Sequence, residues 1–208
     1  TQVTFRKYPA ERALRLADTG RTAGDAQRID GLSKRYPNLI QLRPAINFIE
    51  GTVFTASADF RVKGWQSLKP YRIGVIRGIK FAEAGTAGMK TQAVGKYRNL
   101  FNMLAGGRVD IAVSPRLNGR YQMRQLGIKG IRELNPPVQR FDLFLYLHKK
   151  QAHRIPGLQA VFTKMKASGE LSGIRNRVVR ILMERAAAKK PICDKDYACF
   201  EQGGDKGR

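Results

Sequence analysis

The chain has few acidic residues, few cysteines and no long apolar run. Its 208 residues include 16 Asp and Glu against 39 Lys and Arg, which gives a formal net charge of +23. No apolar stretch approaches the roughly 18 residues that a membrane helix needs, so the sequence predicts no bilayer-spanning segment. A hydrophobic fraction of 42% with 9% aromatics is enough for a packed core, which excludes wholesale disorder.

Cysteine is nearly absent. Cys193 and Cys199 both lie in the C-terminal segment 191–208, with five residues between them. This spacing is open to a small disulfide, which needs an oxidising compartment, or to two separate thiols. It is not zinc-ligand spacing, and no further ligand residues are near. We therefore predict that this tail is disordered or closed by a Cys193–Cys199 disulfide.

The basic excess is spread along the chain and is not confined to a tail. Residues 1–55 carry 9 basic and 5 acidic side chains, residues 56–138 carry 15 and 4, and residues 139–208 carry 15 and 7. Such a balance favours anionic partners such as nucleic acid, lipid head groups or acidic ligands. The alternative is a solvated surface on which the aliphatic stems of the cations cover apolar residues.

Short strands alternate with helices along most of the chain, which predicts an α/β fold with mostly parallel sheets and crossover helices. The expected strands are residues 3–5, 39–43, 46–55, 71–76, 109–113, 131–134 and 141–147, with a break at Pro136 and Pro137. The expected helices are residues 10–17, 96–105, 116–126, 155–168 and 170–188.

The same pattern predicts two lobes. Residues 56–138 form a self-contained β-α-β-α-β pattern, lobe 2, and the two longest strands flank it. Lobe 1 is then built from residues 1–55 and a return segment, residues 139–190. Two strands joining two lobes form a hinge, and the cleft between such lobes is a common place for a ligand.

Residues typical of catalysis and metal binding are scarce. The two histidines, His148 and His153, fall on different faces of a helix, so a shared metal ion is not expected. Residues 85–91 resemble a phosphate-binding loop, but the first glycine is misplaced and Met89 interrupts the Gly-Lys pair. The sequence therefore predicts a protein that is not an enzyme and that needs no metal or cofactor.

Eight short segments match one known family in their order and spacing. They are residues 9–17, 24–29, 36–39, 62–65, 71–78, 107–111, 126–130 and 147–150. On these segments the chain resembles the bacterial extracellular solute-binding proteins of family 3, which have the type II periplasmic-binding-protein fold. The resemblance runs from about residue 3 to about residue 185. It implies that the first strand and helix of lobe 1 are missing from this chain.

The resemblance also implies a function. Members of this family are non-enzymatic and close two lobes around a small ligand, often an amino acid. They deliver the ligand to a membrane transporter or act as sensors. We therefore expect a monomeric, periplasmic protein with a small-molecule ligand. No export signal is visible in the sequence, so we expect that signal to be absent or already removed.

Ligand contacts are implied in both lobes. In lobe 1 an arginine commonly binds the ligand carboxylate, and Arg28, three residues after Asp25, matches that place; a guanidinium fork suits a carboxylate. In lobe 2 the backbone N–H groups of a strand-to-helix turn face the ligand. The residues of this turn are Arg77, Gly78, Ile79 and Lys80. The alternative for Arg28 is an arginine on the surface of a loop, and the alternative for residues 77–80 is an ordinary turn between a strand and a helix.

The segment after the strand at residues 109–113 departs from the family. Many amino-acid binders there present a carboxylate to the ligand's ammonium group, whereas this chain has Ser114, Pro115 and Arg116. Asp110 is expected to pack near the start of the strand. We therefore expect an anionic or amino-acid-like ligand, with the cations Arg28, Arg77, Lys80 and Arg116 and the hydroxyl of Ser114 as candidate contacts.

A basic nucleic-acid or anionic-surface binding protein is the alternative function. Its best segment is residues 174–190, an amphipathic basic helix. Ile174, Val178, Ile181 and Leu182 recur there at core spacing, however, which favours packing within the lobe. No zinc-finger pattern or aromatic RNA-binding signature is present, so nucleic acid is the less favoured partner.

Overall fold

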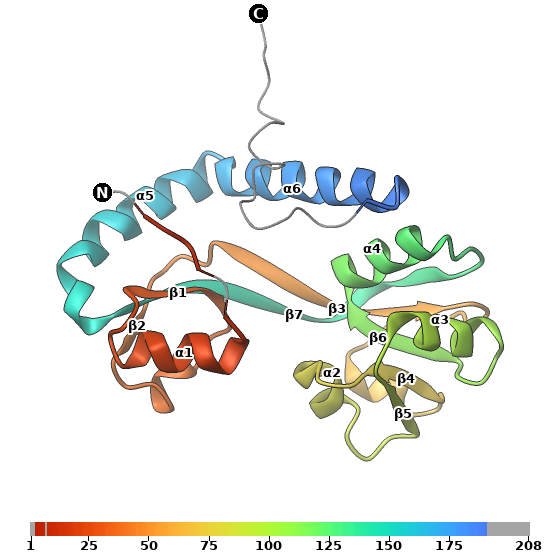
Figure 1. Cartoon of the computed structure of the whole chain (residues 1–208). Coiled ribbons are helices and arrows are strands. Elements are labelled where there is room, and N and C mark those ends of the chain that lie inside the picture. The colour runs from red at the N-terminus through yellow and green to blue at the C-terminus, as the bar shows by residue number, and fades with distance from the viewer. Residues whose placement is uncertain (1–2, 7, 191–208) are drawn as a thin grey trace, which may run out of the picture. The chain divides into compact units, whose positions relative to one another are not determined.

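The computed structural model describes residues 3–6 and 8–190 (Figure 1). Within these residues the chain divides into two compact units. Unit 1 contains the residues up to Phe48 and Phe141–Arg175, and unit 2 contains Ile49–Arg140 and the residues from Asn176. The sequence assigned the whole return segment 139–190 to lobe 1. In the structure, only Phe141–Arg175 of this segment belongs to unit 1, and the residues on either side belong to unit 2. Cys193 and Cys199, with their predicted disulfide, lie outside the described residues.

Helices and strands alternate along the chain, with short 3-10 helices at Leu32–Lys34, Trp65–Leu68 and Lys149–Arg154. The α-helices are α1 (Ala10–Asp18), α2 (Lys80–Gly85), α3 (Tyr97–Ala105), α4 (Arg116–Leu126), α5 (Ile155–Ala167) and α6 (Glu170–Ala187). The strands are β1 (Gly24–Arg28), β2 (Leu39–Gln41), β3 (Asn47–Thr55), β4 (Ile73–Ile76), β5 (Thr91–Val94), β6 (Ile111–Pro115) and β7 (Arg132–His148). β3 and β7 each contain residues of both units, as the predicted two-strand connection requires.

The five predicted helices are confirmed, but two strand predictions are wrong. Residues 3–5 form no strand, and their apolar side chains are exposed, 66% for Val3 and 77% for Phe5. Pro136 and Pro137 do not end a strand, because β7 continues through both positions. Proline removes only its own N–H from a ladder, so a strand can pass through it where that donor has no partner. The short strands β1 and β5 were not among the expected strands, and only the strand-to-helix turn of the resemblance implied α2, since four to six residues carry little periodicity.

Unit 2 contains the parallel sheet that the sequence predicts. β4 pairs in parallel with β5 on one side and with β6 on the other, while β3 pairs antiparallel with β6. α2 and α3 are the crossover connections between these parallel strands, and α4 follows β6 (Figure 1). Two neighbouring parallel strands need a crossover connection between them, and in unit 2 helices provide it.

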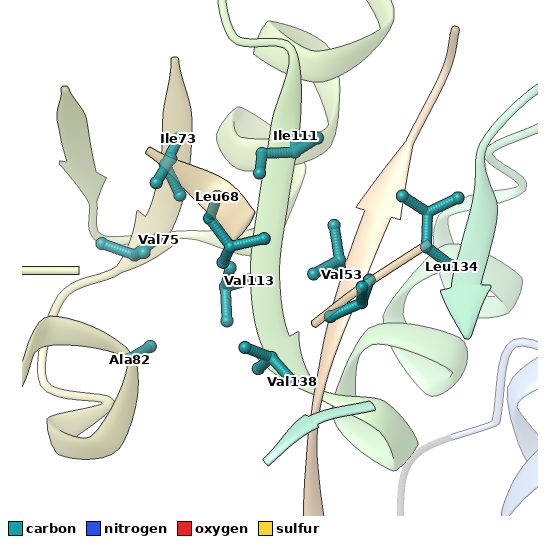
Figure 2. Close-up of a cluster of buried hydrophobic side chains, with 10 residues drawn as sticks. Val53, Leu68, Ile73, Val75, Ala82, Ile111, Val113, Leu134 and Val138 are labelled. Atoms are coloured by element: carbon teal, nitrogen blue, oxygen red, sulfur yellow. The ribbon is translucent and has the colours of Figure 1, made fainter. Parts of the chain in front are cut away.

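Two clusters of buried side chains flank this sheet. In the first, valines and isoleucines of β3, β4 and β6 point toward Leu68, Ala82 of α2 and Leu134 and Val138 of β7 (Figure 2). In the second, Phe54 of β3 meets Leu100, Phe101 and Leu104 of α3, with the Phe54 and Phe101 rings edge to face at 6.0 Å. The unit therefore has a core on both faces of its sheet.

Unit 1 is built differently, and here the prediction of mostly parallel sheets is wrong. β1 and β2 both pair antiparallel with β7. α1 packs through Leu14 and Ala17 on a single cluster that includes Tyr36, Leu39 and Tyr146. Each of these pairings joins strands that are more than 80 residues apart in the chain, because β7 is the segment that returns to unit 1 from unit 2.

Candidate functional site

The parallel strands of unit 2 end at one edge of the sheet. Ile76 of β4 lies opposite Val94 of β5, and Val75 lies opposite Val113 of β6, so the three strands finish at the same level. A helix begins within four residues of each strand end: α2 at Lys80, α3 at Tyr97 and α4 at Arg116. We call this the carboxyl edge of unit 2, residues 77–80, 95–97 and 114–118. Helix N-termini carry unpaired N–H groups and a partial positive charge, which favour an anion.

Four cationic side chains stand at this edge, and two of them are already neutralised. Lys80 pairs with Glu83 at 2.9 Å, and Arg116 pairs with Glu50 and Glu133. Arg77 and Lys96 make no ion pair with any residue that the structure describes. Lys96 precedes α3, whose first turn contains no acidic residue. The positive charge that no ion pair balances in the described residues therefore lies at Arg77, at Lys96 and at the start of α3.

The predicted turn at residues 77–80 is present, but its donors are engaged within the chain. Gly78 has a φ of +89°, a backbone conformation that suits glycine, and its N–H donates to Glu83 Oε1 at 2.7 Å. The Ile79 N–H donates to the Ile76 carbonyl at 3.2 Å, and the Ile79 side chain packs against the core. The Gly78 N–H and then Lys80 hold the pKa of the Glu83 carboxyl below its usual value. Glu83 thus occupies the position expected for a ligand carboxylate.

Ser114 lies at the end of β6 and is fully buried. Its hydroxyl is 2.9 Å from the hydroxyl of Tyr97, the first residue of α3. Burial raises the pKa of Tyr97, although its hydrogen bonds to Ser114 and Asn118 oppose that shift. A neutral hydroxyl pair therefore joins β6, α3 and α4 at the edge. Sequence reasoning did not single out Tyr97, because β5, the strand that ends just before it, was not expected.

Arg116 is the most heavily bonded cation of the edge. Its guanidinium lies 2.9 Å from Glu50 of β3 and 3.2 Å from Glu133 of β7, and it also donates to the Thr52 hydroxyl and the Asn135 amide oxygen. Arg120 forms a second pair with Glu133. The side chain of Arg116 is only 21% exposed. It fastens β3 and β7 to the start of α4, which leaves little of the guanidinium for a ligand. Sequence reasoning did not identify Glu50 and Glu133 as its partners.

The lobe 1 candidates, Asp25 and Arg28, bind each other in unit 1. The guanidinium of Arg28 donates through two nitrogens to Asp25 Oδ2, at 2.8 and 3.0 Å. Between them β1 has a bulge, and Gln27 adopts a φ of +70° that few residues other than glycine accept. The Gln27 side chain accepts a hydrogen bond from Asn47 at 2.6 Å. Strained residues of this kind often mark functional positions.

Metal and membrane sites have no support in the described residues. Within residues 3–6 and 8–190, no three His, Cys, Asp or Glu side chains gather closely enough to hold a metal ion. In the same part of the chain, no helix has both the length and the hydropathy to cross a bilayer. On the basic helix α6, Val178, Ile181 and Leu182 are half-buried, while Ile174 is 37% exposed.

Comparison with known proteins gives few sequence matches. No protein-family model matches the chain. A curated protein of Shewanella oneidensis, described as an uncharacterized protein, is 23% identical over 174 residues, which are 80% of this chain and 66% of that protein. The chain thus spans just under two thirds of the length of this relative.

Solved structures show the fold clearly. A probable amino-acid ABC transporter extracellular-binding protein of Bacillus subtilis matches with a TM-score of 0.62, at 13% identity over 81% of this chain and 76% of its own. The GluR0 ligand-binding core in complex with L-glutamate matches with a TM-score of 0.60, at 11% identity over 88% and 80%. A histidine kinase sensor domain similar to periplasmic binding proteins matches with a TM-score of 0.56, at 14% identity over 81% and 74%. The chain therefore has the two-lobed fold of the periplasmic binding proteins, and these structural neighbours are binding proteins and sensor domains.

Proposed function

We propose that this chain is a non-enzymatic solute-binding domain, related to family 3, that closes its two lobes around one small ligand. The observation that carries the proposal is the likeness of fold, over four fifths of the chain or more, to domains that bind amino acids. An ancestral arginine-binding protein with bound glutamine and the core with bound L-glutamate are among them. Binding by closure needs no covalent chemistry, which agrees with the scarcity of catalytic residues.

The ligand carries one anionic group, which binds at the carboxyl edge of unit 2. Arg77, Lys96 and the first turn of α3 supply the uncompensated positive charge there. Lys80 and Arg116 contribute less to such a ligand, because their charges are already balanced by Glu83, Glu50 and Glu133. Because so few positive charges remain without an ion pair among the described residues of this edge, a small carboxylate suits the site better than a polyanion does.

Glu83 makes an α-amino acid an acceptable ligand. The family's usual carboxylate is replaced by Pro115 and Arg116, so the sequence alone argued against an ammonium group. The Glu83 side chain, 30% exposed, brings a carboxylate to the same edge. A glutamate is ionised at neutral pH, as binding of an ammonium group requires, and the lowered pKa of Glu83 preserves that charge further into acid. We propose Glu83 as the partner of that group.

In lobe 1 we propose Arg28 as a second contact for the ligand, with Asp25 holding its guanidinium in place. The pair is short and largely buried, with 24% of the Arg28 side chain and 9% of the Asp25 side chain exposed. The further parts of the proposal are a monomer in the periplasm or outside the cell that serves a transporter or a sensor. Structural neighbours of both kinds support this context.

A thermal-shift panel tests the function. The panel contains the twenty amino acids, dicarboxylates, sugars, nucleotides and a DNA duplex, each at low and at physiological salt. A ligand at about 100 times its Kd adds roughly 2.7 kcal/mol, which raises Tm by about 5–10 °C. One amino acid or carboxylate is expected to raise Tm at both salt concentrations. A shift with DNA alone, lost at the higher salt, would favour the anionic-surface alternative instead.

Matched variants then test the site. Arg77→Ala/Lys96→Ala is expected to weaken binding of the compound found in the panel by about 10- to 100-fold, because hydrogen bonds to charged groups are lost. The control is Arg61→Ala/Lys90→Ala, which removes two exposed cations of the same unit that lie away from the edge. Equal losses in both variants would show a diffuse charge effect and contradict the proposed site.

A further inference from the structure

Unit 2 has a groove that the proposed ligand site does not use. It lies where the end of α4 and the loop after it meet α6, and its volume is about 540 Å³. Its floor is apolar and consists of Met123, Ile128, Ile131 and Met183. The first three also pack on the core cluster around Phe54, so the floor is fixed from beneath. A volume of this size lies within the usual range of ligand pockets, roughly 300–1,000 Å³.

The rim of the groove is cationic. Arg120, Arg124 and Lys129 line it together with the apolar floor, and none of its lining residues is acidic. The charge of Arg120 is balanced by Glu133. Arg124 and Lys129 are exposed and form no ion pair with another residue in the described part of the chain. The groove therefore suits an occupant that combines large apolar side chains with carboxylates.

The chain itself contains one segment with this chemistry. Residues 192–201 carry the apolar side chains Ile192, Tyr197 and Phe200 together with three carboxylates and one lysine. The segment thus has a net charge of −2 in a chain of net charge +23. The carboxylates belong to Asp194, Asp196 and Glu201.

The distance along the chain allows contact. Met183, on the floor of the groove, precedes the end of α6 at Ala187 by about one helical turn, or roughly 6 Å. Phe200 follows Lys190 by ten residues, which span up to about 33–36 Å when extended. This length is several times what a return over the last turn of α6 requires.

We propose that the groove formed by α4, the loop at residues 127–131 and α6 binds the chain's own segment 192–201. The Met and Ile floor suits the aromatic side chains of this segment, and the cations Arg124 and Lys129 suit its carboxylates. Burial of one aromatic side chain removes about 150–250 Å² from water, so the apolar contact supplies the affinity and the cations supply the orientation. The surface is distinct from the carboxyl edge, and the proposal stands whether or not a solute binds there.

Photo-crosslinking in the full chain tests the proposal. Benzoylphenylalanine replaces Phe200, both cysteines are kept reduced, and the crosslinked residues are mapped by mass spectrometry. The expected product joins position 200 to Met123 or Met183 within one molecule. Arg124→Glu/Lys129→Glu is expected to lower the yield about three- to tenfold, since two partly exposed charge contacts become repulsive. The matched control, Lys63→Glu/Lys69→Glu, makes the same charge change at other exposed lysines of unit 2 and should leave the yield unchanged.

Three results would overturn the proposal. The first is crosslinks that map outside the groove. The second is an unchanged yield in the rim variant. The third is crosslinks between molecules, detected by mixing light and heavy isotope-labelled protein, because these would show that a second copy supplies the segment. Circular dichroism of both variants ensures that loss of yield does not reflect unfolding.

Discussion

Unit 1 and unit 2 illustrate two ways in which the same chain forms a sheet. In unit 2, helices separate consecutive strands, the strands run parallel, and buried clusters cover both faces. In unit 1, both β1 and β2 run antiparallel to the distant strand β7, and one smaller cluster covers the sheet. The parallel arrangement collects three helix N-termini at one edge, whereas the antiparallel one does not. The difference teaches why most of the candidate ligand residues lie in unit 2.

The two units also differ in how their helices are covered. α3 buries Leu100, Phe101 and Leu104 completely or nearly so. α5, which belongs to unit 1, has no fully buried residue along its 13 positions. Unit 2 therefore has the larger share of apolar burial, the dominant favourable contribution to folding. We expect the two units to respond separately to mutations in their cores.

The largest effect is expected from Phe54→Ala in unit 2. Phe54 is fully buried between Phe101 and Gly119, so the substitution leaves a cavity and should lower the free energy of unfolding by about 3–5 kcal/mol. Hydrogen exchange is expected to accelerate in β4 and β6 while β1 keeps its protection. Phe144→Ala, in the cluster of unit 1, should give the reverse pattern. Loss of protection in both units with either variant would show that they unfold as one and would break the comparison.

A smaller loss is expected from Arg116→Ala. The substitution leaves Glu50 and Glu133, 16% and 14% exposed, without their shared guanidinium. Glu133 keeps its pair with Arg120, but the two poorly hydrated carboxylates lose the cation that lies between them, and the free energy of unfolding should fall by about 2–4 kcal/mol. Urea unfolding measures it, with Arg116→Lys as the control that keeps the charge but loses the fork. A decrease in the free energy of unfolding of less than about 1 kcal/mol, the usual contribution of an exposed ion pair, would contradict the role of Arg116 in joining β3 and β7 to α4.

The Arg72–Asp110 pair should make unit 2 sensitive to acid. The Arg72 side chain and its backbone N–H hold the pKa of Asp110 below its ordinary value. A carboxylate with a lowered folded-state pKa adds stability above its unfolded pKa of about 3.9, and this stability is lost as the pH falls further. Asp110→Asn should therefore be less stable than the wild type at pH 7 and lose less on acidification from pH 5 to pH 2.5. Asp59→Asn, which removes an 85% exposed partner of Arg132, should have little effect at either pH.

The smallest effect is a gain. A Cβ at Gly173 of α6 meets no atom within 4 Å, so Gly173→Ala should stabilise the protein by about 0.5–1 kcal/mol through helix propensity. The same change at Gly119 of α4 should destabilise, because its Cβ would lie 2.3 Å from the Phe54 ring. Thermal unfolding of both variants provides the comparison. Equal signs would show that propensity, and not packing on Phe54, decides the outcome at Gly119.

The sequence predicted elements where periodicity was long and partners were near. The apolar spacing of α3 and α4 predicted both helices, and the pattern of residues 71–76 predicted β4. It did not predict that residues 3–5 lack a strand, because pairing depends on a neighbour that local patterning does not reveal. Nor did it show that Pro136 and Pro137 lie within β7, because the effect of a proline depends on whether the ladder needs its missing donor.

The candidate site stays a prediction, and the structure adds details that the sequence did not reveal. The turn implied at residues 77–80 follows β4 and precedes α2. Its carboxylate partners were missed because Glu50, Glu83 and Glu133 are separated from the cations by up to 66 residues or sit on a helix too short to be recognised. Ion pairs of this kind arise from register and topology, so a net charge counted along the sequence overstates the positive charge that a ligand meets.

The most direct test of the account is an amide NMR titration of the full chain with the compound that gives the largest thermal shift in the panel. The account predicts that the N–H signals of Gly78 and residues 96–98, at the carboxyl edge of unit 2, move in proportion to occupancy. The signals of Arg72, Lys90 and Asp110, at the opposite ends of the same strands, should stay in place. Signals that move only at those opposite ends, or only in α6, would contradict the claim that this chain binds its solute at the carboxyl edge.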